Sequence, residues 1–491
     1  MSYLHGTYGM IADEQTQDAS QAGTASAYIG TAPVNLIRGY AQAGIINMPI
    51  RLRRKTEAEN LIGYSDDWSI FTLCEAVAEH FDNQIENVGP IYVINVLDPD
   101  TDRSADKTTE TLTFTKKRAY IRNDKIILDT FAIADKVEGV DYSIAFDFSE
   151  HAAVVTLLGE GADAELECSY YTVDTAGITK DRIIGEETEN GIYTGIHALK
   201  LMYQYNNVVL TNLAAPGWSQ IPDVYRAMVG IVQQLNGHWE GFVSADIPLE
   251  DAEGEPIDTI AKALKWKMDN EYNSEHSKVY WPKVTDEDGR VFHLSTVGQA
   301  VMLRVDLSHD GIPFETPSNK EIMAAAQYFG EESGNRGFDQ NSANQLNASG
   351  ITTACYWAGR WVLWGPHTAA YQYGDELLKT RVIFDGTMRM LKYLVNQFQI
   401  DHGTRIDQPM DVALRDTILN AEKAKLDMLV SIGALAGTPT VQFLEDENST
   451  ENMMNGDFVW DIIATVTPPF KSGTVKVYHT NEGFAALFGE G

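Results

Sequence analysis

The chain has 491 residues, long for a single hydrophobic core, so about three domains are expected. With 44% apolar and 22% charged residues, its composition is that of folded cores and excludes a disordered chain. The 70 acidic residues outnumber the 37 lysines and arginines, and a formal charge of −33 repels phosphate backbones and anionic lipid. We therefore expect no nucleic-acid partner and no membrane contact.

The three cysteines, Cys74, Cys168 and Cys355, stand far apart in the sequence. An odd number without short spacings predicts neither a disulfide framework nor a zinc motif, and it favours a reducing, cytoplasmic origin. The first residues lack the pattern of a signal peptide, and no apolar run approaches the length of a membrane span. The sequence therefore predicts a soluble protein.

Residues 1–24 are polar and small, and the first basic residue is Arg38. The opening "SYLHGTYGMIA" has weak strand character, and the stretch after it, "DEQTQDASQAGTASA", is linker-like. Such an end is either a frayed terminus or an arm that orders on a partner, and the residues leave both possibilities open.

From residue 25 the pattern is globular. Apolar residues at helical spacing, among them Leu73, Val77 and Phe81, predict a helix, and "PIYVINVLD" after it predicts a strand buried on both faces. Helices and strands alternate again from residue 185, with strands in "VVLTNLAAP", "HWEGFVSADIP" and "SKVYWPKV". This alternation predicts an α/β fold with a mostly parallel sheet.

Residues 97–178 have a different pattern. They contain short strand-like runs such as "ETLTFTKKRAYI", "DYSIAFDF" and "AAVVTLLG", separated by turn signals. We expect an all-β module, a small barrel, inserted into the α/β domain.

The last third predicts two long helices, over 375–398 and over 409–432, with Pro409 in the first turn of the second. Strands are expected in "TPTVQFLED" and "GDFVWDIIATVTP", and after Pro468 and Pro469 a final strand in "GTVKVYHT". This C-terminal part is therefore α+β in character.

Residues 402–404, His-Gly-Thr, match the tripeptide around the catalytic histidine of subtilisin-type proteases. That chemistry needs a serine, C-terminal to His402, at the head of a helix, and Ser431, Ser449 and Ser472 do not have this setting. The position between the two long helices predicts a polar loop instead. Histidine spacings, acidic loops and glycine loops predict no catalytic, metal or cofactor-binding residues.

Three longer stretches occur in a characteristic order. They are "NLAAPGWSQIPDVYRAMVGIVQQLNG", the run from "SKVYWPKV" to "GIPFETPSNKEI", and "GRWVLWGPHTAA". Together they resemble the contractile tail sheath family of phages, R-type bacteriocins and related injection machines. The resemblance covers nearly the whole chain. It depends on the order of these stretches and not on any single motif.

The resemblance implies a multidomain α/β (α+β) fold whose core is subtilisin-like in topology but lacks the catalytic triad. The expected parts are an N-terminal arm 1–24, the first part of the core 25–96, an inserted β-rich outer domain 97–178, a subtilisin-like sheath domain 179–370, a tube-facing C-terminal α+β domain 371–469 and a C-terminal arm 470–491. Such a protein is not an enzyme.

The family role is that of a structural subunit. Its copies stack as hexameric rings around an inner tube and contract to drive the tube through a target envelope. The implied partners are copies of this chain, the inner tube protein, and baseplate and tail terminator proteins. The implied origin is the bacterial cytoplasm, with release in a phage tail or bacteriocin particle.

The resemblance also implies that neighbouring subunits are linked by β-strands exchanged from both chain ends. The sequence offers Tyr3, Leu4 and Tyr8 at one end. At the other end it offers Val475, Val477 and His479, which alternate with Lys476 and Tyr478. The alternative is that both ends fold on their own subunit.

Lys423 and Lys425 on the second long helix are candidates for contact with an acidic tube, with an ordinary solvated helix face as the alternative. Two rival functions remain open at this point, a serine hydrolase of subtilisin fold and another self-assembling shell protein.

Overall fold

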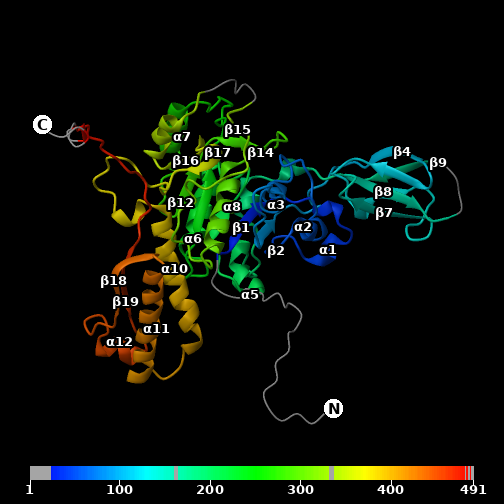
Figure 1. Ribbon diagram of the computed structural model, residues 1–491. Coiled ribbons are helices and arrows are strands. Elements are labelled where there is room, and N and C mark those ends of the chain that lie inside the picture. The colour runs from blue at the N-terminus through cyan, green and yellow to red at the C-terminus, as the bar shows by residue number, and fades with distance from the viewer. Residues whose placement is uncertain (1–23, 160–163, 331–336, 481–482, 485–486, 488–491) are drawn as a thin grey trace, which may run out of the picture.

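The computed structural model describes residues 24–159, 164–330, 337–480, 483–484 and 487. Its largest sheet has eight strands in the order β17-β16-β12-β11-β10-β1-β3-β2 (Figure 1). All neighbouring strands from β16 to β3 are parallel, and only the edge strands β17 and β2 pair antiparallel. The mostly parallel sheet is therefore confirmed. The strands are β1 (Ser26–Gly30), β2 (Ile50–Leu52), β3 (Ile91–Asn95), β10 (Asn212–Ala214), β11 (Phe242–Asp246), β12 (Ser277–Tyr280), β16 (Ile351–Trp357) and β17 (Arg360–Trp364).

Helices cover both faces of this sheet. Phe242 on β11 packs in one hydrophobic cluster with Val297 of α8 (Leu294–Leu307), whereas the next residue, Val243, packs in another with Met228 of α6 (Pro222–Gln233). Successive strand residues point to opposite faces, so α8 and α6 lie on opposite sides of the sheet. The predicted helix over Leu73, Val77 and Phe81 is α3 (Leu73–Phe81), which packs against α8.

Smaller elements complete the core. They are α1 (Tyr40–Ala43), α2 (Lys55–Leu61), α4 (Lys180–Ile184), α5 (Met202–Asn206), α7 (Ile260–Asp269), α9 (Gln340–Asn347) and a three-stranded sheet of β14 (Val291–Phe292), β13 (Lys283–Thr285) and β15 (Ala326–Tyr328).

The strands predicted within residues 97–178 form two three-stranded antiparallel sheets, β4-β9-β6 and β5-β8-β7. They enclose a hydrophobic cluster of their own, which includes Phe114, Ile121 and Val155. Figure 1 shows this outer β module standing away from the large sheet. The two separate sheets do not confirm a small barrel. The strands are β4 (Thr108–Phe114), β5 (Arg118–Ile121), β6 (Ala132–Ile133), β7 (Tyr142–Asp147), β8 (Ala152–Leu157) and β9 (Ala164–Tyr170).

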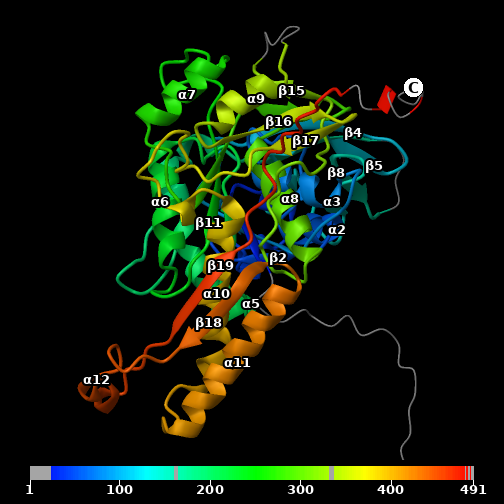
Figure 2. The same cartoon turned by 60° about the vertical axis from the view of Figure 1, so that its left-hand side comes forward.

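The C-terminal unit consists of two long helices and a two-stranded sheet, on the other side of the core from β15 (Figure 2). The helices are α10 (Asp385–His402) and α11 (Val412–Ser431), and the strands are β18 (Leu435–Gln442) and β19 (Asp461–Val466), with the short α12 (Thr450–Asn455) between the strands. Leu435 and Val466 of the strands pack with Leu426 and Leu429 of α11 in one hydrophobic cluster.

Both long helices begin later than the sequence predicts. Helix α10 starts at Asp385 rather than residue 375, because the preceding chain is held on the core, where Thr368 donates a hydrogen bond to the Val382 carbonyl. Helix α11 starts after Asp411, whose carboxylate accepts the backbone N–H of Leu414 at 2.8 Å. This N-cap places Pro409 outside the helix.

Candidate assembly site

The subtilisin-like tripeptide does not form a catalytic site. Gly403 and Thr404 are exposed in the connection between α10 and α11, as predicted for a polar loop, but His402 is buried as the last residue of α10. Its Nε2 lies 2.7 Å from Oε1 of the buried Glu422 on α11, whereas its Nδ1 has no hydrogen-bond partner among the described residues. The ring therefore links two packed helices.

A buried serine does stand at the head of a long helix, Ser295 in the first turn of α8. Its hydroxyl donates to Oδ2 of Asp246, and Oδ1 of the same carboxylate accepts the Ser295 backbone N–H at 2.9 Å. Burial raises the pKa of Asp246. Because the hydroxyl donates to a carboxylate and not to a histidine nitrogen, this arrangement ties the start of α8 to β11 and differs from the serine–histidine pair of a hydrolase.

The described residues contain no cluster of three or more histidine, cysteine or acidic side chains suited to hold a metal ion. Among the described helices, none has both the length and the apolar character needed to cross a bilayer.

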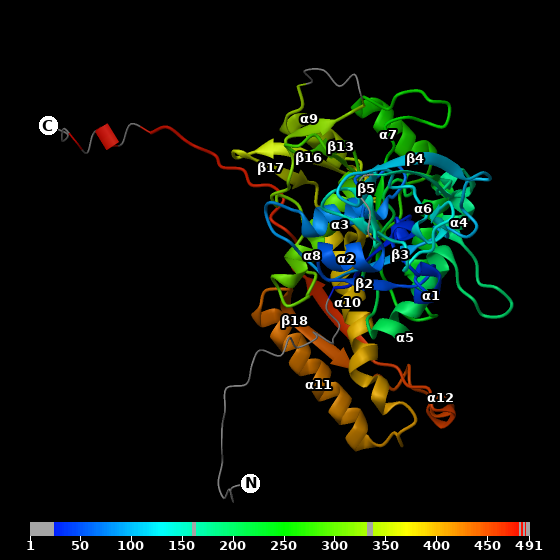
Figure 3. The same ribbon diagram turned by 90° about the vertical axis from the view of Figure 1, so that its right-hand side faces the viewer.

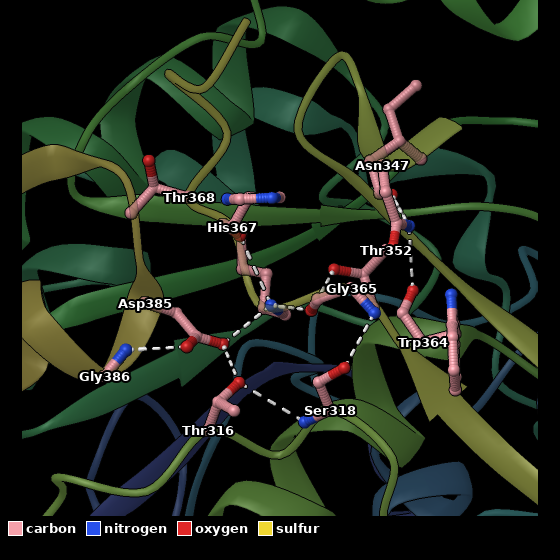
Figure 4. A network of polar contacts seen from close by, with 12 residues as sticks. Thr316, Ser318, Asn347, Thr352, Trp364, Gly365, His367, Thr368, Asp385 and Gly386 are labelled. Carbon is pink, nitrogen blue, oxygen red and sulfur yellow. Dashed lines mark hydrogen bonds and ion pairs between the residues drawn. The ribbon is translucent and has the colours of Figure 1, made fainter. Parts of the chain in front are cut away.

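A buried ion pair joins the large sheet to the C-terminal unit. Nζ of Lys278 on β12 lies 2.7 Å from Oδ2 of Asp385 at the start of α10, and both side chains are completely buried. Lys278 also donates to the carbonyl oxygens of Gly365, at 2.6 Å, and His367, at 3.3 Å, and Thr316 donates to Asp385 at 3.1 Å (Figure 4). These additional hydrogen bonds offset the cost of taking both charges out of water. Burial lowers the pKa of Lys278.

Further polar residues on α10 face the core. Arg389 forms a buried ion pair with Asp306 of α8, and Lys392 donates to the Gly241 carbonyl. Asn396 donates to the Glu240 carbonyl at 2.7 Å. Residues 385, 389, 392 and 396 follow helical spacing, so one face of α10 is held on the core by charged and polar groups.

The floor of a cleft lies beside this ion pair (Figure 4). Ser318 accepts the backbone N–H of Gly365 at 3.0 Å, and Asn347 donates to the carbonyls of Ile351, at 2.9 Å, and Trp364, at 3.0 Å. These bonds tie the loop at 316–318 and helix α9 to the edge of the large sheet.

Residues 469–473 pass along this floor after they leave the C-terminal unit. Together with Trp364, His367 and Tyr371 they line a cleft of about 650 Å³. Tyr371 stacks on His367 with ring centroids 3.6 Å apart, and Nζ of Lys471 lies 5.9 Å from the centroid of Tyr371. The root of the C-terminal arm therefore rests on an aromatic surface of the core.

Beyond the cleft, residues 474–480 extend away from the body (Figure 3). Val475 and Val477 are 84% and 86% exposed, His479 is exposed too, and no strand follows β19 in the described part of the chain. The predicted strand at 473–480 does not form within one chain, so its pairing with a neighbour stays a prediction.

The small sheet of the C-terminal unit has open edges. It consists of β18 and β19 alone among the described residues, so each strand has one edge without a sheet partner. A two-stranded sheet is marginal in isolation, and this one packs against α11 and α10. The unpaired edges are sites at which a further strand can add.

The other candidate residues lie in different surroundings. Tyr3, Leu4 and Tyr8 lie outside the described residues. Lys423 is exposed on α11, whereas the Lys425 side chain is 12% exposed, and its Nζ lies 2.8 Å from Asp401 and 2.7 Å from Glu422. No observation tests tube contact for either lysine.

Sequence reasoning missed the buried charges that hold α10. A signal was present, because Lys278 interrupts the otherwise apolar strand "SKVYW", and a charge there needs a buried partner. The polar residues at 385, 389, 392 and 396 also recur at helical spacing. The identity of each partner could not be read, since Lys278 and Asp385 are 107 residues apart.

A search of protein-family models gives no match. Two curated proteins are similar to this chain. The tail sheath protein of Burkholderia phage BcepMu is 25% identical over 509 residues and covers 99% of each chain. The tail sheath protein of Escherichia phage P2 is 24% identical over 318 residues, which is 63% of this chain and 73% of the relative. The chain is thus similar in sequence to tail sheath proteins of two phages.

Solved structures of sheath proteins and their complexes have the same fold. A chain of the anti-feeding prophage baseplate matches with a TM-score of 0.54 at 14% identity, covering 97% of this chain and 100% of its own. The contracted sheath complex of the PVC extracellular contractile injection system matches with a TM-score of 0.55 at 12% identity. The match covers 98% of this chain and 100% of the PVC chain. A sheath tail protein from Desulfitobacterium hafniense matches with a TM-score of 0.51 at 10% identity. The match covers 94% of this chain and 100% of that protein. The sequence similarity is therefore to structural tail sheath proteins, and the shared fold is that of solved sheath chains.

Proposed function

We propose that this sheath subunit polymerises as stacked hexameric rings around an inner tube and contracts to drive that tube through a target envelope. The observation that carries the proposal is the C-terminal arm, whose residues 474–479 extend from the body and form no strand in the described part of the chain, where β18 and β19 also have open edges. Because strand addition uses backbone groups, an arm from one copy fits an edge on another.

The proposed links hold neighbours together while they move. An arm strand of about eight residues adds about four backbone hydrogen bonds at roughly 1 kcal/mol each. One link is weak by itself, but every copy contributes one at each end, the N-terminal arm carrying Tyr3, Leu4 and Tyr8. Head-to-tail contacts of this kind do not close, so they generate a helical array.

The free energy for contraction is stored during assembly. The proposed extended array is kinetically trapped, and contraction gains contact area between bodies that stay rigid. The buried ion pairs of α10 support this rigidity, because they fasten the C-terminal unit to the core. The solved PVC relative is a sheath in its contracted state.

The remaining assignments follow from the same proposal. The core at 25–96 and 179–370 has a subtilisin-like topology, 97–178 lies on the outside, and 371–469 faces the tube through Lys423 and Lys425. The partners are copies of this chain, the inner tube protein, and baseplate and tail terminator proteins. The particle is a phage tail or a bacteriocin-like device made in the bacterial cytoplasm.

The test is assembly of purified protein, observed by negative-stain microscopy and sedimentation. The full chain should form hollow, obliquely striated tubes, and chains lacking residues 1–22 or 474–491 should remain monomeric with an unchanged thermal midpoint. Val477→Pro should weaken assembly because proline removes a backbone donor, whereas Val477→Thr should not. Intact tubes from either truncated chain would refute the arm assignment.

A further inference from the structure

An exposed aromatic surface borders the root of the C-terminal arm. We define the arm-root patch as Trp357, Trp364, Tyr371, Tyr373 and Phe470. Trp357 and Trp364, on the hairpin of β16 and β17, have ring centroids 5.7 Å apart, and the other three line the same cleft as Trp364. The patch is therefore continuous from the hairpin to the arm.

Members of the patch are unusually accessible for aromatic residues. Trp357 is 41% exposed, Tyr373 73% and Phe470 90%. Single exposed apolar residues are ordinary, but a contiguous aromatic group marks an interaction site. Aromatic side chains bury a large area at a small cost in conformational entropy, and they are enriched at the centres of protein interfaces.

The patch also carries positive charge on a strongly acidic chain. Arg360 is the cross-strand partner of Trp357, and Lys471 lies over Tyr371. Arg360 has one acidic neighbour, Glu321, at 3.9 Å, with both side chains nearly half exposed. A partner for this surface should therefore be apolar and acidic.

The chain itself presents such a surface. We define the acidic tip as residues 443–459, the connection between β18 and β19. It exposes Leu444 and Met454 together with three successive carboxylates, Glu445, Asp446 and Glu447. Figure 1 shows α12, within the acidic tip, at the opposite end of the molecule from β16 and β17, so the two surfaces do not meet within one chain.

We propose that the arm-root patch of one subunit binds the acidic tip of the second copy that receives its C-terminal arm. The inference rests on the proposed function, because it takes that arm to pair with β18 or β19 of a neighbour. Residues 474–480 span at most about 25 Å when extended, so the recipient sheet lies within that distance of the patch. The acidic tip is the end loop of that sheet and carries the complementary charge.

The first test truncates the aromatic side chains. The variant Trp357→Ala with Tyr373→Ala should raise the protein concentration needed for tube assembly at least about tenfold, as loss of interface anchors does. The matched control is Tyr120→Ala, an exposed tyrosine on β5 of the outer β module, which should leave that concentration unchanged. Thermal midpoints measured on the monomers check that every variant is folded.

The second test reverses charges and asks whether the acidic tip is the surface that binds the arm-root patch. Arg360→Glu should raise the protein concentration needed for tube assembly. Adding Glu447→Lys in the same chain should bring that concentration back to within about threefold of the value for the unmodified chain, because the opposite charges again face each other. A double variant that assembles worse than Arg360→Glu alone would refute binding of the acidic tip to the arm-root patch.

The outcomes separate the two proposals. If the unmodified chain assembles and the aromatic double variant assembles equally well, the patch is not an interface and this inference fails alone. If the unmodified chain never assembles, the proposed function fails as well.

Discussion

At the scale of single residues, Glu79 on α3 is a buried carboxyl with incomplete hydrogen bonding. Its Oε1 accepts from Asn83 at 2.9 Å, while its Oε2 is buried without a partner. Burial raises the pKa of Glu79 to about 8, so the group is protonated in the folded chain at neutral pH. An unfolded glutamate loses its proton near pH 4.

This difference predicts a pH dependence of stability. Between about pH 4.5 and 8 the native state holds a proton that the unfolded state lacks, so the free energy of unfolding contributed by Glu79 falls as pH rises. The slope is on the order of 1 kcal/mol per pH unit at most. Urea unfolding at pH 5 and pH 8 should show a smaller decline for Glu79→Gln than for the unmodified chain. An equal decline in both proteins would contradict the assignment.

At the scale of elements, α10 connects two parts of the molecule. Its first turn is bound to the core through Asp385 and Lys278, and its last residue, His402, contacts Glu422 on α11. Charged groups thus occupy positions that apolar residues fill in an ordinary amphipathic helix. Such pairs fix the position of the helix, because any shift leaves a charge buried without a partner.

Breaking the ion pair from one side should therefore be costly. Asp385→Asn keeps the shape but leaves the Lys278 ammonium buried without a counter-charge, and we expect a loss of about 3–5 kcal/mol in the free energy of unfolding. The combined variant Asp385→Leu with Lys278→Met removes both charges, and its free energy of unfolding should fall by clearly less. Chemical denaturation of the unmodified chain, the single variant and the combined variant measures the three free energies of unfolding. A combined loss as large as the single one would contradict the electrostatic account.

At the scale of the whole molecule, the outer β module has its own core but shares a packed base with the large domain. The backbone N–H of Ser104 donates to the carbonyl of Thr172 at 2.8 Å, so the chain enters and leaves the module side by side. Leu36 packs in the hydrophobic cluster of the module, and Ile127 of the module packs in that of the core. Asn35 also donates to the carbonyls of Asp124 and Ile126. The module is therefore a folding unit attached through both apolar and polar contacts.

Replacing residues 105–171 by a short glycine-rich turn should leave a folded chain that still assembles. The free energy of unfolding should fall by at least about 1–3 kcal/mol, since Asn35 loses its buried partners and the apolar contacts of Leu36 and Ile127 are lost as well. Microscopy should show tubes of smaller outer diameter, with sedimentation as the check on yield. Loss of tubes from a folded variant would place the module at an essential contact instead of the outer surface.

The sequence alone determined the architecture where local patterns and burial agree. The strand "PIYVINVLD" is β3, buried along its whole length, and helix–strand alternation predicted the parallel sheet. Periodicity carries this information because each element must bury its own apolar side. The sequence also predicts a C-terminal arm from the apolar alternation beyond Pro468 and Pro469, and the pairing of this arm with a neighbour stays a prediction.

Only the tertiary structure decided which distant residues meet. The start of α10, the pairing of Lys278 with Asp385, and the role of His402 all depend on partners outside the local sequence, whereas the start of α11 follows from its local cap, Asp411. The aromatic patch joins residues near 357 to Phe470 across the body of the fold. A local pattern records that a group needs a partner, but the path of the folded chain selects which partner it has.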